Sequence, residues 1–212
     1  MECVKGVLLL AGTGRRFGWE VPKQFVHVGG KPLYAYALET LLSTETFQEI
    51  IVVCHPDWMI EPAPRLRVIE GGATRRDSSY LGLLACGDAT DIVVIHDGAR
   101  PFVSEQLIRD HIEAARRYGA VDTCIPSADT IVTSRDGTSI DDIPDRNALL
   151  RGQTPQSFSY PLIKRAHEEH SESVTDDCSL ALREGHPVHI LEGSESNIKI
   201  TTELDLSLAE QV

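Results

Sequence analysis

Short apolar runs alternate with segments of helical periodicity along the chain, and this alternation limits the fold more than any other feature. The runs Glu49–Cys54 and Ile92–His96 are rich in β-branched residues, a pattern typical of strands buried on both faces of a parallel sheet. Between such runs, residues 32–43 repeat apolar side chains at helical spacing. Strands that alternate with helices in this way predict an α/β fold with a mostly parallel, twisted sheet and right-handed crossovers.

The chain is long enough for one hydrophobic core, so we expect a single domain over residues 1–212. We find no internal repeat and no low-complexity linker that would divide it. The expected strands are 7–11, 49–54, 66–70, 92–96, 120–126 and 188–192, and the expected helices are 32–43, 74–86, 104–118, 160–170, 177–184 and 203–211.

Residues 127–156 interrupt the alternation. Two short β-like pieces, Thr130–Ser134 and Ser139–Ile143, flank the turn sequence Arg135-Asp136-Gly137. We therefore expect a β-hairpin arm over about residues 130–150 that projects from the domain, either as a decoration of the fold or as an arm that grips a partner.

Composition excludes several classes of function. The formal net charge of −12 argues against a nucleic-acid or anionic-membrane surface. No apolar run approaches the roughly 20 residues that cross a bilayer. The five cysteines are scattered, with no Cys-x-x-Cys pair, which favours reduced thiols and a cytoplasmic protein.

The strand at residues 7–11 ends in Gly12-Thr13-Gly14, and basic residues follow at Arg15, Arg16 and Lys23. Glycines allow backbone N–H groups to approach a phosphate, and the cations would neutralise it. An ordinary surface loop with exposed basic residues is the structural alternative. A Walker loop is absent, and a dinucleotide fingerprint does not fit, because the third glycine comes one position late.

In an open parallel sheet, ligands bind outside the carboxyl ends of the strands. The residues expected there combine cations, hydroxyls and one carboxylate, a set that suits a triphosphate, a magnesium ion and a second phosphate. They are Arg16, Lys23, Arg75, Arg100, Ser78, Thr130 and Asp97.

Two further pairs have competing interpretations. His167 and His170 suit either a metal pair or a solvated helix face, and we favour the solvated face. Asp176 and Asp177 suit either a metal pair or a helix cap, and we favour capping for one of them.

In these motifs the chain resembles the 2-C-methyl-D-erythritol 4-phosphate cytidylyltransferase family, whose sister family is ribitol-5-phosphate cytidylyltransferase. The matching motifs occur in family order and span nearly the whole chain. They are Ala11-Gly12-Thr13-Gly14-Arg15-Arg16, Pro22-Lys23-Gln24-Phe25, Gly71-Gly72-Ala73-Thr74-Arg75 with Ser78, His96-Asp97-Gly98-Ala99-Arg100-Pro101, Asp129-Thr130, Gln153-Thr154-Pro155-Gln156, Thr175-Asp176-Asp177 and Asn197-Ile198-Lys199-Ile200-Thr201.

The resemblance implies a Rossmann-like nucleotidyltransferase domain of isoprenoid precursor synthesis. It implies that CTP and a sugar-alcohol phosphate are joined with Mg²⁺ to give 4-CDP-2-C-methyl-D-erythritol and pyrophosphate. It also implies a homodimer in which Arg146, on the arm, enters the neighbouring subunit's site. The implied roles are Arg16 and Lys23 as catalytic residues; Ala11, Gly12, Gly14, Gly72, Ala73, Arg75, Ser78 and Lys199 around the nucleotide, with Ser78 reading the base; Asp97, Arg100, Thr130, Arg146 and Thr154 around the acceptor; and Asp97 at the metal.

Three residues depart from the family pattern: Leu10, Ala73 and Val132. Leu10 stands in place of a small residue near the base and would shift the loop, and Val132 favours the ribitol branch. Ala99 and Asp177 favour methylerythritol phosphate, which we expect as the acceptor. A non-catalytic CTP-binding module and a nicotinamide-dependent oxidoreductase are the alternatives from other classes.

Overall fold

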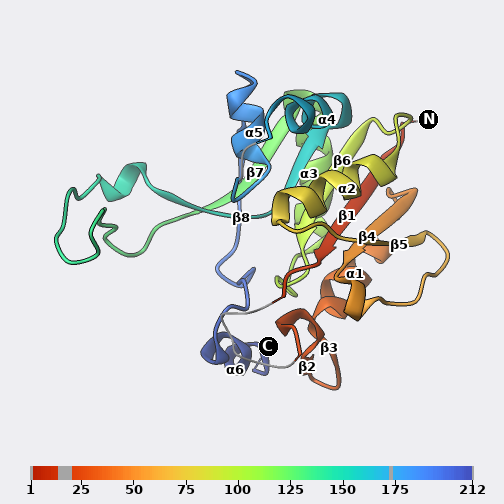
Figure 1. Cartoon of the computed structure of the whole chain (residues 1–212), viewed down its shortest axis with the longest axis horizontal. Coiled ribbons are helices and arrows are strands. Elements are labelled where there is room, and N and C mark those ends of the chain that lie inside the picture. Colours follow the sequence, from red (N-terminus) through yellow and green to blue (C-terminus); the bar gives the residue numbers. More distant parts are fainter. Residues whose placement is uncertain (1, 14–20, 172–173, 212) are drawn as a thin grey trace.

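The computed structural model describes residues 2–13, 21–171 and 174–211. Its centre is a seven-stranded sheet with the order β5-β4-β1-β6-β8-β7-β9, and β2 and β3 form a separate two-stranded ladder (Figure 1). The strands are β1 (Val4–Leu10), β2 (His27–Val28), β3 (Lys31–Pro32), β4 (Glu49–Cys54), β5 (Leu66–Glu70), β6 (Ile92–Asp97), β7 (Ala120–Pro126), β8 (Leu150–Ser159) and β9 (His189–Glu192). The helices are α1 (Leu33–Ser43), α2 (Arg75–Cys86), α3 (Glu105–Tyr118), α4 (Tyr160–Glu169), α5 (Cys178–Arg183) and α6 (Glu203–Ala209), with 3₁₀ turns η2 (Lys23–Phe25), η3 (Pro56–Trp58) and η4 (Arg146–Ala148).

The expected α/β fold with a mostly parallel sheet is confirmed. β1 pairs in parallel with β4 and β6, β4 with β5, and β7 with β9. β8 runs antiparallel to both of its neighbours, β6 and β7. This strand was not predicted from the sequence, because it lies in the stretch expected to interrupt the fold.

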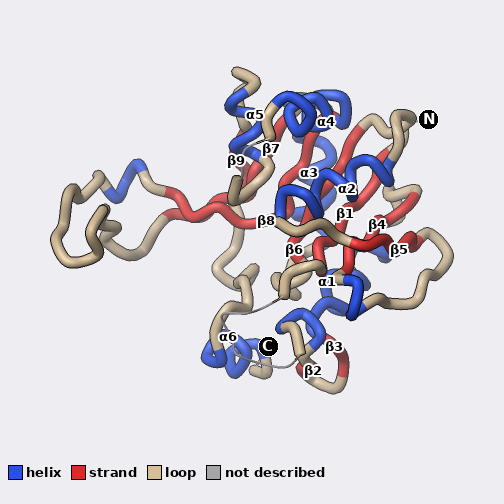
Figure 2. The backbone as a smooth tube through the Cα atoms, viewed as in Figure 1, coloured by secondary structure: helices blue, strands red, loops and turns tan. Residues whose placement is uncertain are grey.

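Helices cover both faces of the sheet (Figure 2). Because side chains alternate along a strand, Leu8 packs with the cluster beneath α1 and α3, while Val7 packs with the cluster beneath α2, α4 and α5. Within the described residues, no helix has both the length and the apolar character needed to cross a bilayer.

Local sequence signals explain where the helices begin. Thr74 and Asp77 form a capping box at the start of α2, and Ser104 accepts the Leu107 N–H at the start of α3. Gly119 ends α3 with φ of 78°, a backbone conformation that favours glycine. The bounds expected from these signals therefore agree closely with the structure.

The arm projects away from the sheet, continuing from β7 and β8 (Figure 1). Two hairpin strands were expected in it, but the structure contains a single antiparallel bridge between Thr133 and Asp142. The Asp136 carboxylate instead accepts the N–H groups of Thr138 and Ser139 and organises the tip as a polar turn. An isolated two-stranded ladder gains little stability without a packed face, which explains the short pairing.

Candidate active site

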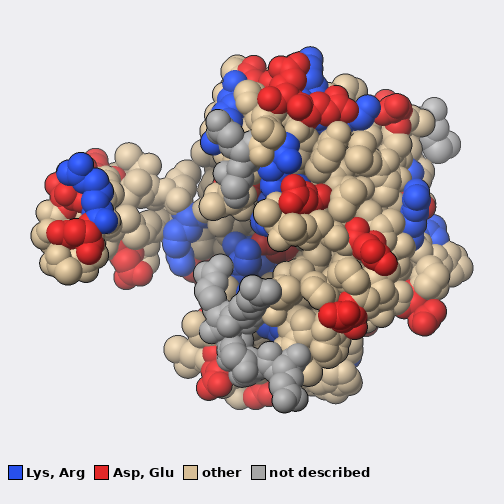
Figure 3. Space-filling model, in the orientation of Figure 1, with Lys and Arg blue, Asp and Glu red and all other residues tan. Residues whose placement is uncertain are grey.

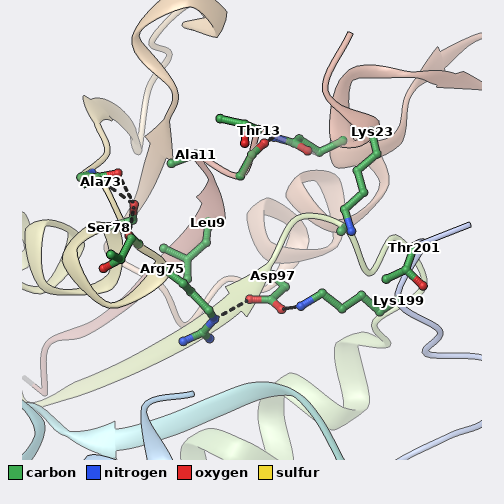
Figure 4. A pocket seen from close by; sticks show the side chains of 15 residues that line it. Leu9, Ala11, Thr13, Lys23, Ala73, Arg75, Ser78, Asp97, Lys199 and Thr201 are labelled. Carbon is green, nitrogen blue, oxygen red and sulfur yellow. Dashed lines mark hydrogen bonds and ion pairs between the residues drawn. The ribbon is translucent and has the colours of Figure 1, made fainter. Parts of the chain in front are cut away.

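A cavity of about 440 Å³ opens at the carboxyl ends of β1, β5 and β6, where an α/β sheet is expected to bind ligands (Figure 4). The residues around it come from five separate parts of the chain. They are Leu9, Ala11, Gly12, Thr13, Lys23, Gln24, Gly72, Ala73, Thr74, Arg75, Ser78, Asp97, Ala99, Lys199 and Thr201.

One wall is formed by the loop after β1 and by η2. The buried Gln24 side-chain amide donates to the carbonyl oxygens of Leu10 at 2.6 Å and Gly12 at 2.7 Å, so it fixes the course of the loop. Lys23, one residue earlier, extends into the cavity (Figure 4). Gly14 and Arg16, expected at the nucleotide and in catalysis, lie outside the described residues.

The opposite wall is formed by residues 71–74 and the first turn of α2. A Cβ atom on Gly72 would lie 2.3 Å from the Cβ of Asp77, so this close approach requires glycine. The Gly72 N–H donates to Ser78 Oγ at 3.1 Å, and the Ser78 hydroxyl donates to the carbonyl oxygen of Thr74 at 2.9 Å. Ser78 thus lines the cavity as expected, but its hydroxyl holds the loop backbone.

Asp97, at the end of β6, lies at the centre of the charged groups (Figure 4). Its Oδ2 is 2.6 Å from Lys199 Nζ, and its Oδ1 is 3.3 Å from Arg75 Nε. Burial alone would raise the pKa of Asp97, but Arg75 and Lys199 outweigh burial and hold that pKa well below its usual range. Asp97 is therefore a carboxylate at neutral pH.

Arg75 also contacts a second carboxylate, Asp177, with its Nη1 2.8 Å from Asp177 Oδ2. The fully buried Asp177 accepts further hydrogen bonds from Ser79 Oγ at 2.6 Å and His167 Nε2 at 2.9 Å. The expected solvated face is therefore wrong for His167, which is buried. Capping is carried out by Asp176, which accepts the N–H of Ser179 at 2.9 Å.

Arg100 and Thr154 lie behind Asp97, outside the cavity lining. The Asp97 N–H donates to Thr154 Oγ1 at 3.1 Å, and the Thr154 hydroxyl donates to His96 Nδ1 over 3.0 Å. His96 Nε2 in turn donates to the Arg100 carbonyl oxygen over 2.9 Å. Burial lowers the pKa of His96 to about 4, so the imidazole is neutral and its tautomer is fixed by these two bonds.

The buried Arg100 guanidinium donates to two backbone carbonyl oxygens, that of Asn197 at 2.7 Å and that of Gly152 at 3.3 Å. Asn197 lies two residues before Lys199, and its side-chain amide donates to the Thr154 carbonyl oxygen at 2.8 Å. This network holds the segment that carries Lys199 against the start of β8.

Thr130 and Arg146 are on the arm and are not brought to this cavity within one chain. Arg146 is exposed, and its Nη1 lies 3.4 Å from the Ala128 carbonyl oxygen at the base of the arm. Figure 3 shows Lys and Arg side chains gathered in the hollow between the arm and the body of the molecule.

Leu10 does not face the cavity as the resemblance implied. It is fully buried in the core, and a Cβ atom on Gly98 would lie 2.1 Å from Leu10 Cδ2. The preceding residue, Leu9, lines the cavity instead, because neighbouring strand residues point to opposite faces. Ala73 does lie at the cavity.

Several cavity residues were given no role from the sequence, among them Gln24 and Thr201. Both stand inside matched motifs, but nothing local marks Gln24 as a loop anchor, because its acceptors lie 12 and 14 residues earlier. Among the described residues, no three His, Cys, Asp or Glu side chains cluster as a cation site, so Asp97 is a lone carboxylate there.

Comparisons with known proteins agree with this geometry. The sequence model of 2-C-methyl-D-erythritol 4-phosphate cytidylyltransferase matches residues 4–212. A protein of that name from Clostridium perfringens (strain SM101 / Type A) is 42% identical over 99% of this chain and 98% of its own length. The crystal structure of the enzyme of that name from Thermus thermophilus is 33% identical, with a TM-score of 0.82 over 97% of this chain and 96% of that chain. The structure of 4-diphosphocytidyl-2C-methyl-D-erythritol synthase from Anaerococcus prevotii DSM 20548 is 29% identical, with a TM-score of 0.85 over 99% of this chain and 95% of that chain.

The chain therefore belongs to the 2-C-methyl-D-erythritol 4-phosphate cytidylyltransferase family of nucleotidyltransferases.

Proposed function

We propose that this chain transfers the cytidylyl group of CTP to the phosphate of 2-C-methyl-D-erythritol 4-phosphate. A phosphate oxygen of the acceptor attacks the α-phosphorus of CTP, the bond from that phosphorus to the bridging oxygen of the β-phosphate breaks, and pyrophosphate leaves. The observation that carries the proposal is the convergence of Lys23, Arg75 and Lys199 on one cavity around Asp97.

The chemistry needs no general base, because the attacking phosphate oxygen is already an anion at neutral pH. The protein must instead bring two polyanions together and stabilise charge around the α-phosphorus. A cation 4 Å from a phosphate charge contributes about 4 kcal/mol at an effective dielectric constant of 20. Lys23 and Lys199 are the cavity cations that we assign to the triphosphate, together with Arg16.

The nucleotide occupies the space between the two glycine-bearing loops. Ala11, Gly12 and Gly14 form one side, and Gly72 and Ala73 form the other. Backbone N–H groups of such loops suit phosphate and base oxygens. Ser78 serves this site by holding the second loop in shape.

Asp97 is the residue that would hold a magnesium ion in this proposal. Mg²⁺ is usually held by one or two carboxylates, with substrate phosphates and water as the remaining ligands. Asp97 would hold the ion, and each of its oxygens keeps a lone pair beyond its ion pair. When bound, the ion would supply charge neutralisation at the phosphates.

The acceptor side requires a homodimer in this proposal. Arg146 of the partner subunit, with the partner subunit's Thr130, would bind the acceptor phosphate at this chain's cavity. Arg100 and Thr154 support the same side indirectly, because they hold the backbone around Asp97 and Gly152.

The test measures pyrophosphate release from CTP with 2-C-methyl-D-erythritol 4-phosphate and with D-ribitol 5-phosphate, each supplied separately. We expect release with the first and not with the second. Release with ribitol phosphate alone would reassign the acceptor. Absence of release with both, while CTP still binds, would support the non-catalytic CTP-binding module instead.

We also place the reaction in the cytoplasm. All five cysteines are free thiols in the structure, and three of them are buried. A reducing compartment suits such a set.

A further inference from the structure

Asp177 has a placement that its position in the sequence does not explain. It stands at the cap position of α5, yet its side chain accepts no capping hydrogen bond, since Asp176 does that. Its carboxylate is fully buried and points at Arg75 on the first turn of α2. Burying the charge of a carboxylate costs free energy unless a cation pairs with it. Even a paired carboxylate is often no more stabilising than an apolar residue, so a role in the site is the explanation that we examine for Asp177.

The two oxygens of Asp177 are divided between two tasks. Oδ1 accepts from Ser79 Oγ and His167 Nε2, which fixes the orientation of the carboxylate. Oδ2 faces Arg75 Nη1 at 2.8 Å. The ring of His167 is held in turn by a parallel stack on Tyr80, with centroids 5.5 Å apart.

From Arg75 the alternation of charge continues into the cavity. Arg75 Nε contacts Asp97 Oδ1, and Asp97 Oδ2 contacts Lys199 Nζ. Asp177, Arg75, Asp97 and Lys199 thus form one line of alternating charges, hereafter the charge line, whose inner end is buried and whose outer end lies at the cavity. Each member is oriented by the one behind it.

We propose that Asp177 is a positioning residue for the cytidylyl transfer: with Ser79 and His167 it orients Arg75, and through Arg75 it holds Asp97 and Lys199 at the cavity. The proposal deepens the proposed function and rests on it. Arg75, divided between two carboxylates, then acts as a fixed support for Asp97 more than as a phosphate ligand.

The decisive variant is Asp177→Asn, which keeps the size of the side chain and removes its charge. Without that charge, Arg75 is free to turn entirely to Asp97 and displace Lys199 from its place. Because small displacements of catalytic groups cost rate, we expect kcat at saturating CTP to fall at least about tenfold. The freed positive charge stays beside an anionic substrate, so the KM for CTP should not rise.

Three variants distinguish positioning from simple support of the fold. Ser79→Ala removes one bond to Asp177 and keeps the charge, so a smaller fall in kcat is expected. Asp176→Asn, the adjacent carboxylate that caps α5, is the matched control and should retain wild-type kcat. In an Arg75→Met background, adding Asp177→Asn should change kcat by less than about twofold, because the effect acts through Arg75.

All rates are normalised to the folded fraction, measured by thermal unfolding of each variant with and without CTP. If Asp177→Asn fails to fold, the kcat of Ser79→Ala decides. A fall in kcat supports the proposal, and a wild-type kcat overturns it. A kcat within threefold of wild type in folded Asp177→Asn would overturn the proposal, as would an equal loss with and without Arg75. Wild-type pyrophosphate release is measured in the same series, so failure of the proposed reaction is recognised separately.

Discussion

The charge line shows how individual residues at the site depend on one another. Lys199 and Asp97 are 102 positions apart in the chain, and so are Asp177 and Arg75. Motifs singled out Asp97, Arg75 and Lys199 one by one, because each follows a recognisable apolar run or matched segment. Which carboxylate faces which cation depends on the order of the strands, and sequence spacing carries no information on that.

Lys23 is the cavity cation whose removal tests the electrostatic part of the mechanism. Lys23→Ala should lower kcat about 100- to 1,000-fold, the range seen when one preorganised charge or donor is removed from a transition state. The measurement is pyrophosphate release at saturating substrates. Lys31→Ala, which removes a half-buried lysine paired with Glu39, is the control and should have wild-type kcat. Near-normal turnover of Lys23→Ala would remove Lys23 from the catalytic residues.

Removing the Gln24 side chain tests whether its hydrogen bonds hold the loop after β1 in place. Gln24→Ala leaves the carbonyl oxygens of Leu10 and Gly12 without this donor. The bond to Leu10 is buried, and an unpaired buried group costs about 1–3 kcal/mol. We expect a lower urea midpoint and a loss of kcat/KM for CTP, since Lys23 is the adjacent residue. A variant with reduced stability but unchanged kcat/KM would show that the loop keeps its course without this anchor.

At the scale of elements, β8 is the strand of the main sheet that the sequence did not predict. Apolar strands such as β4 and β6 were predicted correctly, because continuous runs of β-branched residues are typical of strands buried on both faces. β8 carries Gln153, Thr154 and Gln156 into the centre of the sheet, where polar residues ordinarily argue against a strand. Their partners are the side chains of Asn197, His96 and Asp122. These partners come from other strands and segments, so the strand becomes intelligible only once the fold is assembled.

The buried His111 connects α3 to β7 and β8 by hydrogen bonds, and its burial predicts that the folded protein loses stability in acid. His111 Nδ1 lies 2.8 Å from Ser157 Oγ, and Nε2 lies 2.7 Å from Thr123 Oγ1. Burial, with a smaller contribution from His96, lowers the pKa of His111 from 6.5 to about 3. The unfolded chain therefore takes up this proton at a higher pH than the folded chain does. The stabilisation is complete above pH 6.5 and is lost as the pH falls toward 3.

The measurement is the free energy of unfolding in urea at pH 7.0, 5.5 and 4.5 for wild type and His111→Gln, whose side chain takes up no proton. The variant should be less stable at pH 7.0, and its deficit should shrink on acidification by at most about 1.4 kcal/mol per pH unit. A deficit that stays constant over this range would contradict the assignment of a neutral, proton-resisting His111.

At the scale of the whole molecule, the projecting arm has too little contact of its own to explain its shape. Its apolar side chains are exposed, with Ile140 at 60% and Ile143 at 56%, and its described backbone pairing is limited to one bridge. Exposed apolar groups on a thin projection are typical of a surface that a protein partner covers. The same arm carries Arg146 away from its own chain's cavity, which favours a site shared between subunits.

Sharing of the site predicts complementation between two inactive variants. In a dimer of Lys23→Ala with Arg146→Ala subunits, the cavity of the Arg146→Ala subunit keeps its own Lys23 and receives Arg146 of the partner subunit. On co-expression, about half of all dimers contain one subunit of each variant. One of the two sites in each mixed dimer is intact, so about a quarter of all sites are intact. We therefore expect about a quarter of the wild-type activity per site. Each variant expressed alone provides the baseline. If Arg146 acted within its own chain, every site in the mixture would lack one of the two residues, and activity would stay at that baseline.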